Sequence, residues 1–119
     1  MAYLIDLPTF GDARGSLTVF EKNLPFEPLR TYFVYNVTEK RGGHRHKKNR
    51  QALIAAAGSI EVYVNNGKEE QTFILNSRDT CLIVEPEDWH TMDNFKDNAV
   101  LLVFASELYD IDDYIDEEY

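Results

Sequence analysis

Apolar and polar residues alternate with a period of two along most of this chain, a pattern typical of β-strands with one face in a protein core. β-Branched and aromatic residues dominate these runs, and turn residues separate them. The predicted strands cover residues 16–21, 30–37, 51–57, 59–64, 71–75, 80–84 and 99–104. Asn66-Gly67 lies between two of them and predicts a hairpin with a type I′ turn, because both central positions of that turn need positive φ.

Helical spacing is confined to the last segment, where Leu108, Ile111 and Ile115 fall on one face. We therefore predict a short acidic C-terminal helix after the strands. Many short strands with frequent turns indicate an all-β sandwich or barrel. The 119 residues, 44% of them apolar, fit one globular domain over residues 1–119. A domain of this size has little stability to spare, so dimerisation is a natural source of further buried area.

Charge and cysteine content exclude several classes of protein. The net charge of −9 argues against a nucleic-acid partner. Cys81 is the single cysteine, lies in an apolar run and is interpreted as a small buried side chain. An intrachain disulfide is excluded, which suits a reducing cytoplasm. No leader pattern and no membrane-length apolar run are present, so we predict a cytoplasmic protein with no membrane partner.

Basic residues gather in one loop of this acidic chain. Residues 40–50 hold six of the 12 Lys and Arg residues, and the final ten residues hold six acids and no base. We interpret these basic residues as solvated surface charges, with the binding of a small anion by the loop as the alternative interpretation. The acidic tail is interpreted as a solvated face or as a segment at a dimer interface, because its charges would repel a phosphorylated ligand.

The basic loop also contains two histidines, His44 and His46, which are two residues apart. In an extended segment such residues point to the same side. The pair resembles the first motif of the cupin superfamily, with Gln51 in place of that motif's Glu and with Gly58 at its Gly position. Pro86 to His90 resembles the second motif. This resemblance implies a cupin fold, an RmlC-like jelly roll, with both motifs at one mouth of the barrel.

Gln51 bears on whether a metal is present. Cupins that bind a metal use a carboxylate at this position, and a neutral amide is a poor substitute on a divalent ion. We therefore predict no metal and no other cofactor, which leaves both imidazoles free for acid–base chemistry. A metal-dependent cupin oxygenase is the alternative that Gln51 disfavours.

A narrower resemblance extends over most of the chain. Five segments resemble motifs of the WxcM-like sugar 3,4-ketoisomerase family: Asp12–Leu17, Arg30–Phe33, Arg41–Lys47, Pro86–Met92 and Ser106–Asp110. The resemblance implies a homodimeric isomerase of dTDP-4-keto-6-deoxyglucose that serves deoxyamino-sugar biosynthesis. It implies that His44 and His46 transfer protons, that Arg14 binds the diphosphate of the nucleotide, and that a tyrosine lies near the sugar. That tyrosine is Tyr32, with Tyr35 as the alternative.

The chemistry of the reaction suits these residues. Imidazole has an ordinary pKa of about 6.5 and serves as a base near neutral pH. We favour His44 as the base that removes the carbon proton and His46 as the shuttle between the sugar oxygens. The planar fork of Arg41 matches a phosphate, and Gln51 is predicted to orient an imidazole. His90 is either a third polar group at the sugar or a structural histidine.

Two other functions remain open at this point. A sugar-nucleotide 3,5-epimerase also removes a proton beside a ketone, but it needs groups on both sides of the ring. A non-catalytic sugar-nucleotide-binding module would bind the same ligand, and its binding would survive the loss of either histidine.

Overall fold

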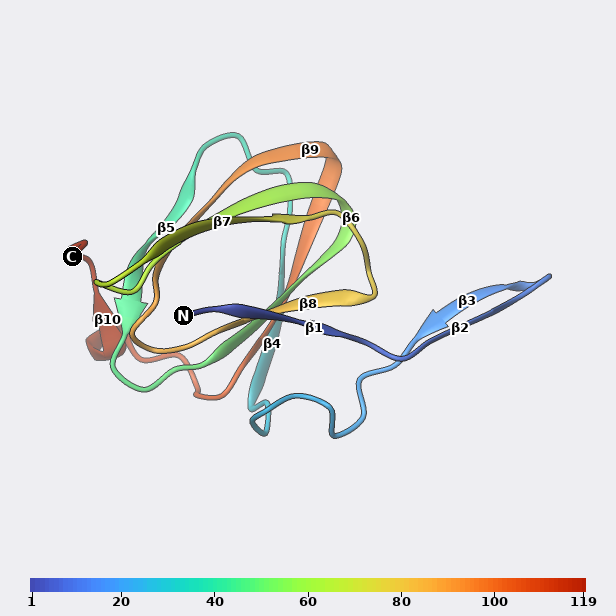
Figure 1. Cartoon of the computed structure of the whole chain (residues 1–119), viewed down its shortest axis with the longest axis horizontal. Coiled ribbons are helices and arrows are strands. Elements are labelled where there is room, and N and C mark those ends of the chain that lie inside the picture. The colour runs from blue at the N-terminus through green and yellow to red at the C-terminus, as the bar shows by residue number, and fades with distance from the viewer.

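The computed structural model describes all 119 residues and is built almost entirely from antiparallel strands (Figure 1). Eight strands share one sheet in the order β1-β8-β6-β9-β5-β10, with β7 paired to β6 and β4 paired to β9, while β2 and β3 form a separate hairpin. The strands are β1 (Tyr3–Asp6), β2 (Thr9–Asp12), β3 (Gly15–Thr18), β4 (Arg30–Val34), β5 (Arg41–His46), β6 (Gln51–Asn65), β7 (Glu70–Leu75), β8 (Thr80–Val84), β9 (Trp89–Ala105) and β10 (Tyr114–Ile115). The predicted all-β fold is confirmed.

The long strands β6 and β9 run through both halves of the barrel and pair with each other from Gln51↔Ala105 to Asn65↔Trp89. The two strands predicted at 51–57 and 59–64 are therefore one strand, β6, which bends at Gly58. Gly58 has φ of 69°, and a Cβ there would collide with the carbonyl oxygen of Lys96. Only glycine permits so close a backbone approach in this conformation.

Residues of β6, β8 and β9 bury side chains on both faces, which explains why their sequences are nearly continuous apolar runs. One face fills the barrel and includes Leu53, Val62, Leu82 and Leu101. The other face packs under the segment that precedes β4. Its buried residues are Leu7, Ala52, Ile54, Cys81 and Ile83, with Phe20, Leu24 and Phe26 packed against them. Cys81 is fully buried, as predicted.

The C-terminal prediction was wrong in its element type. Instead of a helix, the tail forms a single 3-10 turn, η1 (Ile111–Asp113), followed by β10, which pairs with β5. Leu108 and Ile111 are 68% and 70% exposed, so the predicted apolar face has no core to pack against. Helices of this length need such packing to be stable.

The hairpin between β6 and β7 is present, but its turn is longer than the predicted type I′ turn. The loop spans residues 66–69, and Gly67 has a positive φ whereas Asn66 does not. The Asn66 side chain accepts hydrogen bonds from the backbone N–H groups of Lys68 and Glu69, which stabilises the wider loop. No helix in the structure is long and apolar enough to cross a bilayer.

Candidate active site

A β-bulge in β5 sets the position of the histidine pair. The register between β5 and β9 shifts between Gly42 and His44, after which His44 lies opposite His90. Gly42 has φ of 85°, and a Cβ there would lie 2.8 Å from the carbonyl oxygen of His90. The glycine thus allows β5 to lie close to β9 and re-aims the strand just before the first histidine.

The bulge brings all three histidines of the chain together. The ring centroids of His44 and His46 lie 5.1 Å apart, and His44 is 5.3 Å from the ring of His90. Tyr114 of β10 packs against His44 and His46, at 4.7 Å from each ring. His46 and His90 are 3% and 1% exposed, so this is an enclosed imidazole cluster rather than a surface patch.

Asp113 is a site residue that the sequence analysis missed. Its Oδ2 lies 3.0 Å from Nδ1 of His46, and both side chains are buried. The acidic tail is therefore not only a solvated face, because it brings one carboxylate to the histidine pair. The two residues are 67 positions apart in the sequence, and a run of Asp and Glu gives no sign of which member turns inward.

Tyr32 and Gln51 form a second polar contact inside the barrel. The Gln51 Nε2 donates a hydrogen bond to the Tyr32 hydroxyl at 3.1 Å. The prediction that this amide orients an imidazole was wrong, because its Nε2 bonds a tyrosine on β4 and its Oε1 has no hydrogen-bond partner in the protein. Arg30, also on β4, stacks its guanidinium over the Tyr32 ring at 4.7 Å and forms no ion pair.

Burial and mutual repulsion keep the cluster uncharged. Burial lowers the pKa of His44 to about 3, with additional lowering by His90 and His46. Burial likewise lowers the pKa of His90 to about 4, although its Nδ1 lies 3.0 Å from the backbone carbonyl of Asp88. Burial lowers the pKa of His46 as well, but Asp113 acts in the opposite direction. At neutral pH all three rings are therefore neutral.

The remaining predicted residues lie in different parts of the molecule. Arg41 is exposed on β5, opposite Met92 of the barrel core. Burial raises the pKa of Tyr32, and the charges of Arg30 and Arg41 partly oppose this rise. Tyr35 is 62% exposed beyond the end of β4 and is not part of the histidine cluster. Arg14 lies at the tip of the β2–β3 hairpin, where its side chain is 89% exposed and pairs with Asp12 at 2.7 Å. Within one copy of the chain, Arg14 and Tyr35 are thus separated from the histidines.

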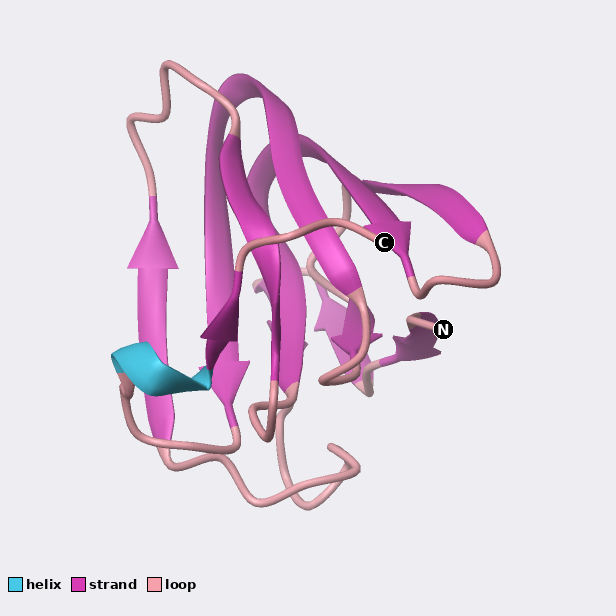
Figure 2. Cartoon of the chain, turned by 90° about the vertical axis from the view of Figure 1, so that its left-hand side faces the viewer, coloured by secondary structure: helices cyan, strands magenta, loops and turns pink.

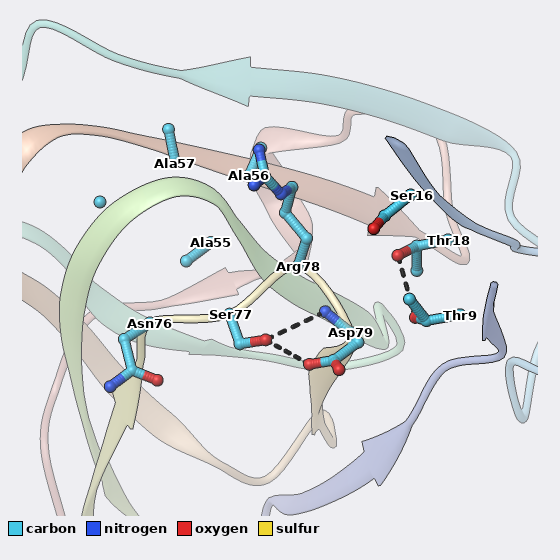
Figure 3. Close-up of a pocket in the computed structure, with 11 residues that line it drawn as sticks. Thr9, Ser16, Thr18, Ala55, Ala56, Ala57, Asn76, Ser77, Arg78 and Asp79 are labelled. Carbon is cyan, nitrogen blue, oxygen red and sulfur yellow. Dashed lines mark hydrogen bonds between the residues drawn. The ribbon is translucent and has the colours of Figure 1, made fainter. Parts of the chain in front are cut away.

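The hairpin projects from the end of the molecule opposite to β5 and β10 (Figure 1). A polar cavity of about 450 Å³ lies at its base, between the hairpin, the bend of β6 and the β7–β8 turn (Figure 3). Thr9 and Thr18 share a hydrogen bond of 3.0 Å on one side of this cavity, and the Ser77 hydroxyl donates to Asp79 on the other. None of the histidines lines it.

An antiparallel barrel with imidazoles held at one end defines the class of protein: an RmlC-like cupin. A solved dTDP-4-dehydrorhamnose 3,5-epimerase from Bacillus anthracis superimposes with a TM-score of 0.83 over 95% of this chain and 76% of its own, at 18% identity. At that identity the likeness shows the fold alone, and it confirms the predicted cupin architecture.

The chain belongs to the WxcM-like, C-terminal family (FdtA), whose family model matches residues 2–119. A TDP-4-oxo-6-deoxy-alpha-D-glucose-3,4-oxoisomerase from Aneurinibacillus thermoaerophilus is 41% identical over 108 residues, which are 87% of this chain and 78% of the relative. A solved 3,4-ketoisomerase from Helicobacter canadensis is 36% identical, with a TM-score of 0.92 over 98% of this chain and 90% of its own.

A third relative was solved with a sugar nucleotide bound. It is a variant of the 3,4-ketoisomerase QdtA from Thermoanaerobacterium thermosaccharolyticum in complex with TDP-4-keto-6-deoxyglucose. It is 36% identical, with a TM-score of 0.93 over 98% of this chain and 87% of its own. These comparisons confirm the predicted family and the enzyme class, an isomerase.

Proposed function

We propose that this protein is a 3,4-ketoisomerase of dTDP-4-keto-6-deoxyglucose in deoxysugar biosynthesis, and that it works without a metal or redox cofactor. The observation that carries the proposal is the His44–His46 pair, two neutral imidazoles 5.1 Å apart in an enclosed cluster beside Tyr114. Neutral imidazole is the form that a base needs. Relatives that act on this class of sugar nucleotide support the substrate.

The reaction exchanges a carbonyl and an alcohol between adjacent carbons. A base removes the hydrogen from C3, which the C4 ketone acidifies, and an enediolate forms. A proton is then added at carbon C4, and the proton that leaves the C3 hydroxyl is passed to the C4 oxygen, so that C3 becomes the carbonyl and C4 the alcohol. The oxidation at C3 equals the reduction at C4, so the balance closes with proton transfers alone.

The surroundings of the two imidazoles favour His46 as the base at carbon and His44 as the shuttle between oxygens, the reverse of the order favoured from sequence. A pKa of about 3 makes His44 a weak base. The lowering at His46 is opposed by the Asp113 carboxylate, and the Nε2 of His46 is buried with no partner in the protein. A buried nitrogen without a partner requires an explanation, and in this proposal the substrate supplies the partner.

We infer that Tyr32 and Arg30 stabilise the developing enediolate. The Tyr32 oxygen accepts its hydrogen bond from Gln51, so its own hydroxyl hydrogen remains free to donate to a sugar oxygen. Arg30 adds a cation that no carboxylate neutralises, 4.7 Å from the same ring. Fixed donors and charges aimed at the position of developing charge are usually the largest catalytic contribution.

Arg14 fits this function only if a second copy of the chain provides it. The hairpin carries Phe10 and Leu17, which are paired with each other and are 62% and 60% exposed. A neighbouring hollow of about 520 Å³ is partly apolar, with Phe20, Ile54 and Leu102 in its lining. We infer a cytoplasmic homodimer in which the hairpin of each copy reaches the other, and Arg14 binds the diphosphate there.

The test is turnover of dTDP-4-keto-6-deoxyglucose in D₂O, followed by NMR. A 3-keto sugar with deuterium at C4 supports the proposal, and His46→Asn should lower the rate by about 10²–10⁴-fold while the fold is retained. Deuterium at C3 and C5 without a 3-keto product would identify a 3,5-epimerase instead. Tight binding with no exchange would identify a non-catalytic module.

A further inference from the structure

We propose that Asp113 is a positioning residue that holds His46 in the tautomer with its hydrogen on Nδ1, so that the unpaired Nε2 is left as the acceptor. The catalytic meaning of this inference rests on the proposed function, whereas the tautomer itself does not. The C-terminal tail thereby becomes part of the active site. Figure 2 views the molecule from this end, where the tail crosses in front of the strands.

The contacts of the carboxylate determine which partner carries the hydrogen. Oδ1 of Asp113 accepts the backbone N–H of Lys48 at 2.9 Å, and Oδ2 accepts the backbone N–H of Asn49 at 3.2 Å. Oδ2 also lies 3.0 Å from Nδ1 of His46. An ionised carboxylate only accepts hydrogen bonds, so the hydrogen in this last contact belongs to the imidazole. A neutral imidazole has one N–H, which leaves Nε2 with a free lone pair.

The backbone around Asp113 holds the carboxylate in place. Its N–H donates to the carbonyl of Asp110 at 3.1 Å, and its carbonyl accepts the N–H of Lys47 at 2.9 Å. The next residue, Tyr114, is paired with His46 in the register of β10 and β5. Asp113 is 8% exposed, so water competes little for these bonds. The carboxylate and the imidazole are therefore fixed relative to each other before any substrate arrives.

No other group around His46 can replace Asp113. The titratable or charged side chains that face His46 are His44 on the same strand, His90 on β9, Tyr114 on β10 and Arg30 on β4. None of them is a carboxylate, and the charge of Arg30 lowers the pKa of His46 further. Asp113 alone opposes the lowering. Without it, His46 would lose its fixed tautomer and the only contact that opposes the lowering of its pKa.

The experiment compares the full-length wild type with Asp113→Asn by ¹⁵N NMR of the histidine side chains at neutral pH, without ligand. An amide at 113 can still accept the Lys48 N–H through an oxygen at the Oδ1 position, although the bond from the Asn49 N–H is lost. An NH₂ at the Oδ2 position donates to Nδ1 of His46 and moves the hydrogen to Nε2. Asp112→Asn is the matched control, because Asp112 is the exposed neighbour in η1. We expect the tautomer shift in Asp113→Asn only, with a loss of kcat of about 10²-fold or more and a KM within about threefold.

Two results would overturn the proposal. One is a wild-type His46 that carries its hydrogen on Nε2, which can be read even if Asp113→Asn does not fold. The other is a folded Asp113→Asn that retains the Nδ1–H tautomer or the wild-type kcat. Asp113→Glu keeps a carboxylate and should have a higher kcat than Asp113→Asn. If Asp113 had only a structural role, the longer side chain of Glu would not be expected to recover kcat. If the wild type lacks turnover, the proposed function fails, while the NMR result still decides the role of Asp113.

Discussion

The two ends of this molecule carry residues of the same predicted site but differ in how they are held. At one end, His44, His46 and His90 are enclosed by β5, β9 and β10, with rings 5.1–6.3 Å apart. At the other end, Arg14 lies on a two-stranded hairpin that makes no ladder contact with the main sheet. The comparison teaches that the reacting groups are fixed within one chain, whereas the proposed phosphate ligand depends on what the hairpin meets.

Among the variants that compare the two ends, the largest effect should be the rise in KM of Arg14→Ala, which tests whether the hairpin belongs to the site. Charged hydrogen bonds contribute about 1.5–3 kcal/mol, so KM should rise about 10–100-fold with little change in Tm, since the side chain is 89% exposed. Lys47→Ala, an exposed base of the histidine loop, is the matched control. Steady-state kinetics give both values, and an unchanged KM would remove Arg14 from the site.

A mixture of two impaired variants, one with a raised KM and one with a lowered rate, tests the second copy directly at low substrate concentration. A hybrid dimer of Arg14→Ala and His46→Asn has one site with both native residues, so mixing should restore activity. No recovery from subunits shown to exchange would contradict a site shared between copies.

A smaller effect is expected from Gly42→Ala, which tests the histidine end. The left-handed φ of 85° costs an alanine about 1–2 kcal/mol, and its Cβ would push on the His90 carbonyl at 2.8 Å. Both Tm and kcat should fall, because β5 shifts against β9. Gly15→Ala is the comparison at the hairpin, since Gly15 also has positive φ but no atom within 4 Å of its Cβ. It should lower Tm without lowering kcat, and an equal loss of kcat in both variants would refute the assignment of the bulge.

The smallest effect is a pH dependence of stability from the buried imidazoles. Unfolded histidine titrates near pH 6.5, whereas His44 and His90 titrate at about 3 and 4 in the fold. Between these values the unfolded chain binds more protons, so the free energy of unfolding falls as pH decreases from about 6.5. Thermal melts from pH 8 to pH 4.5 should show this slope, and His44→Asn should reduce it. A variant with the wild-type slope would show that His44 is not buried as a neutral ring.

The sequence was sufficient for features that depend on neighbours in the chain. Alternation predicted β3, β4, β6, β7, β8 and the end of β9, but not β1, β2, β5 or β10. The spacing of His44 and His46 predicted that both rings share one side. The second motif placed His90 correctly with them. These features follow from local backbone geometry, which a single sequence records.

Features that depend on distant contacts were not visible in the sequence. Asp113 contacts His46, which is 67 residues away in the sequence. Because its neighbours are also acidic, the sequence does not distinguish it from them. The strand β10 has only two residues and forms because the edge of β5 offers partners. The partner of Gln51, Tyr32, lies on β4, which pairs with β9 as β6 does, and alternation does not predict this sheet order.

The continuous pairing of β6 with β9 has a consequence for how activity is lost on heating. Gln51 and His90 lie on these two strands, while β4 and β5, which carry Tyr32 and His46, are both bonded to β9. Local opening cannot separate these side chains without breaking the ladder that also holds the barrel together. Heat should therefore separate these four side chains only at global melting, so any earlier loss of activity would point to opening of the tail or of the hairpin.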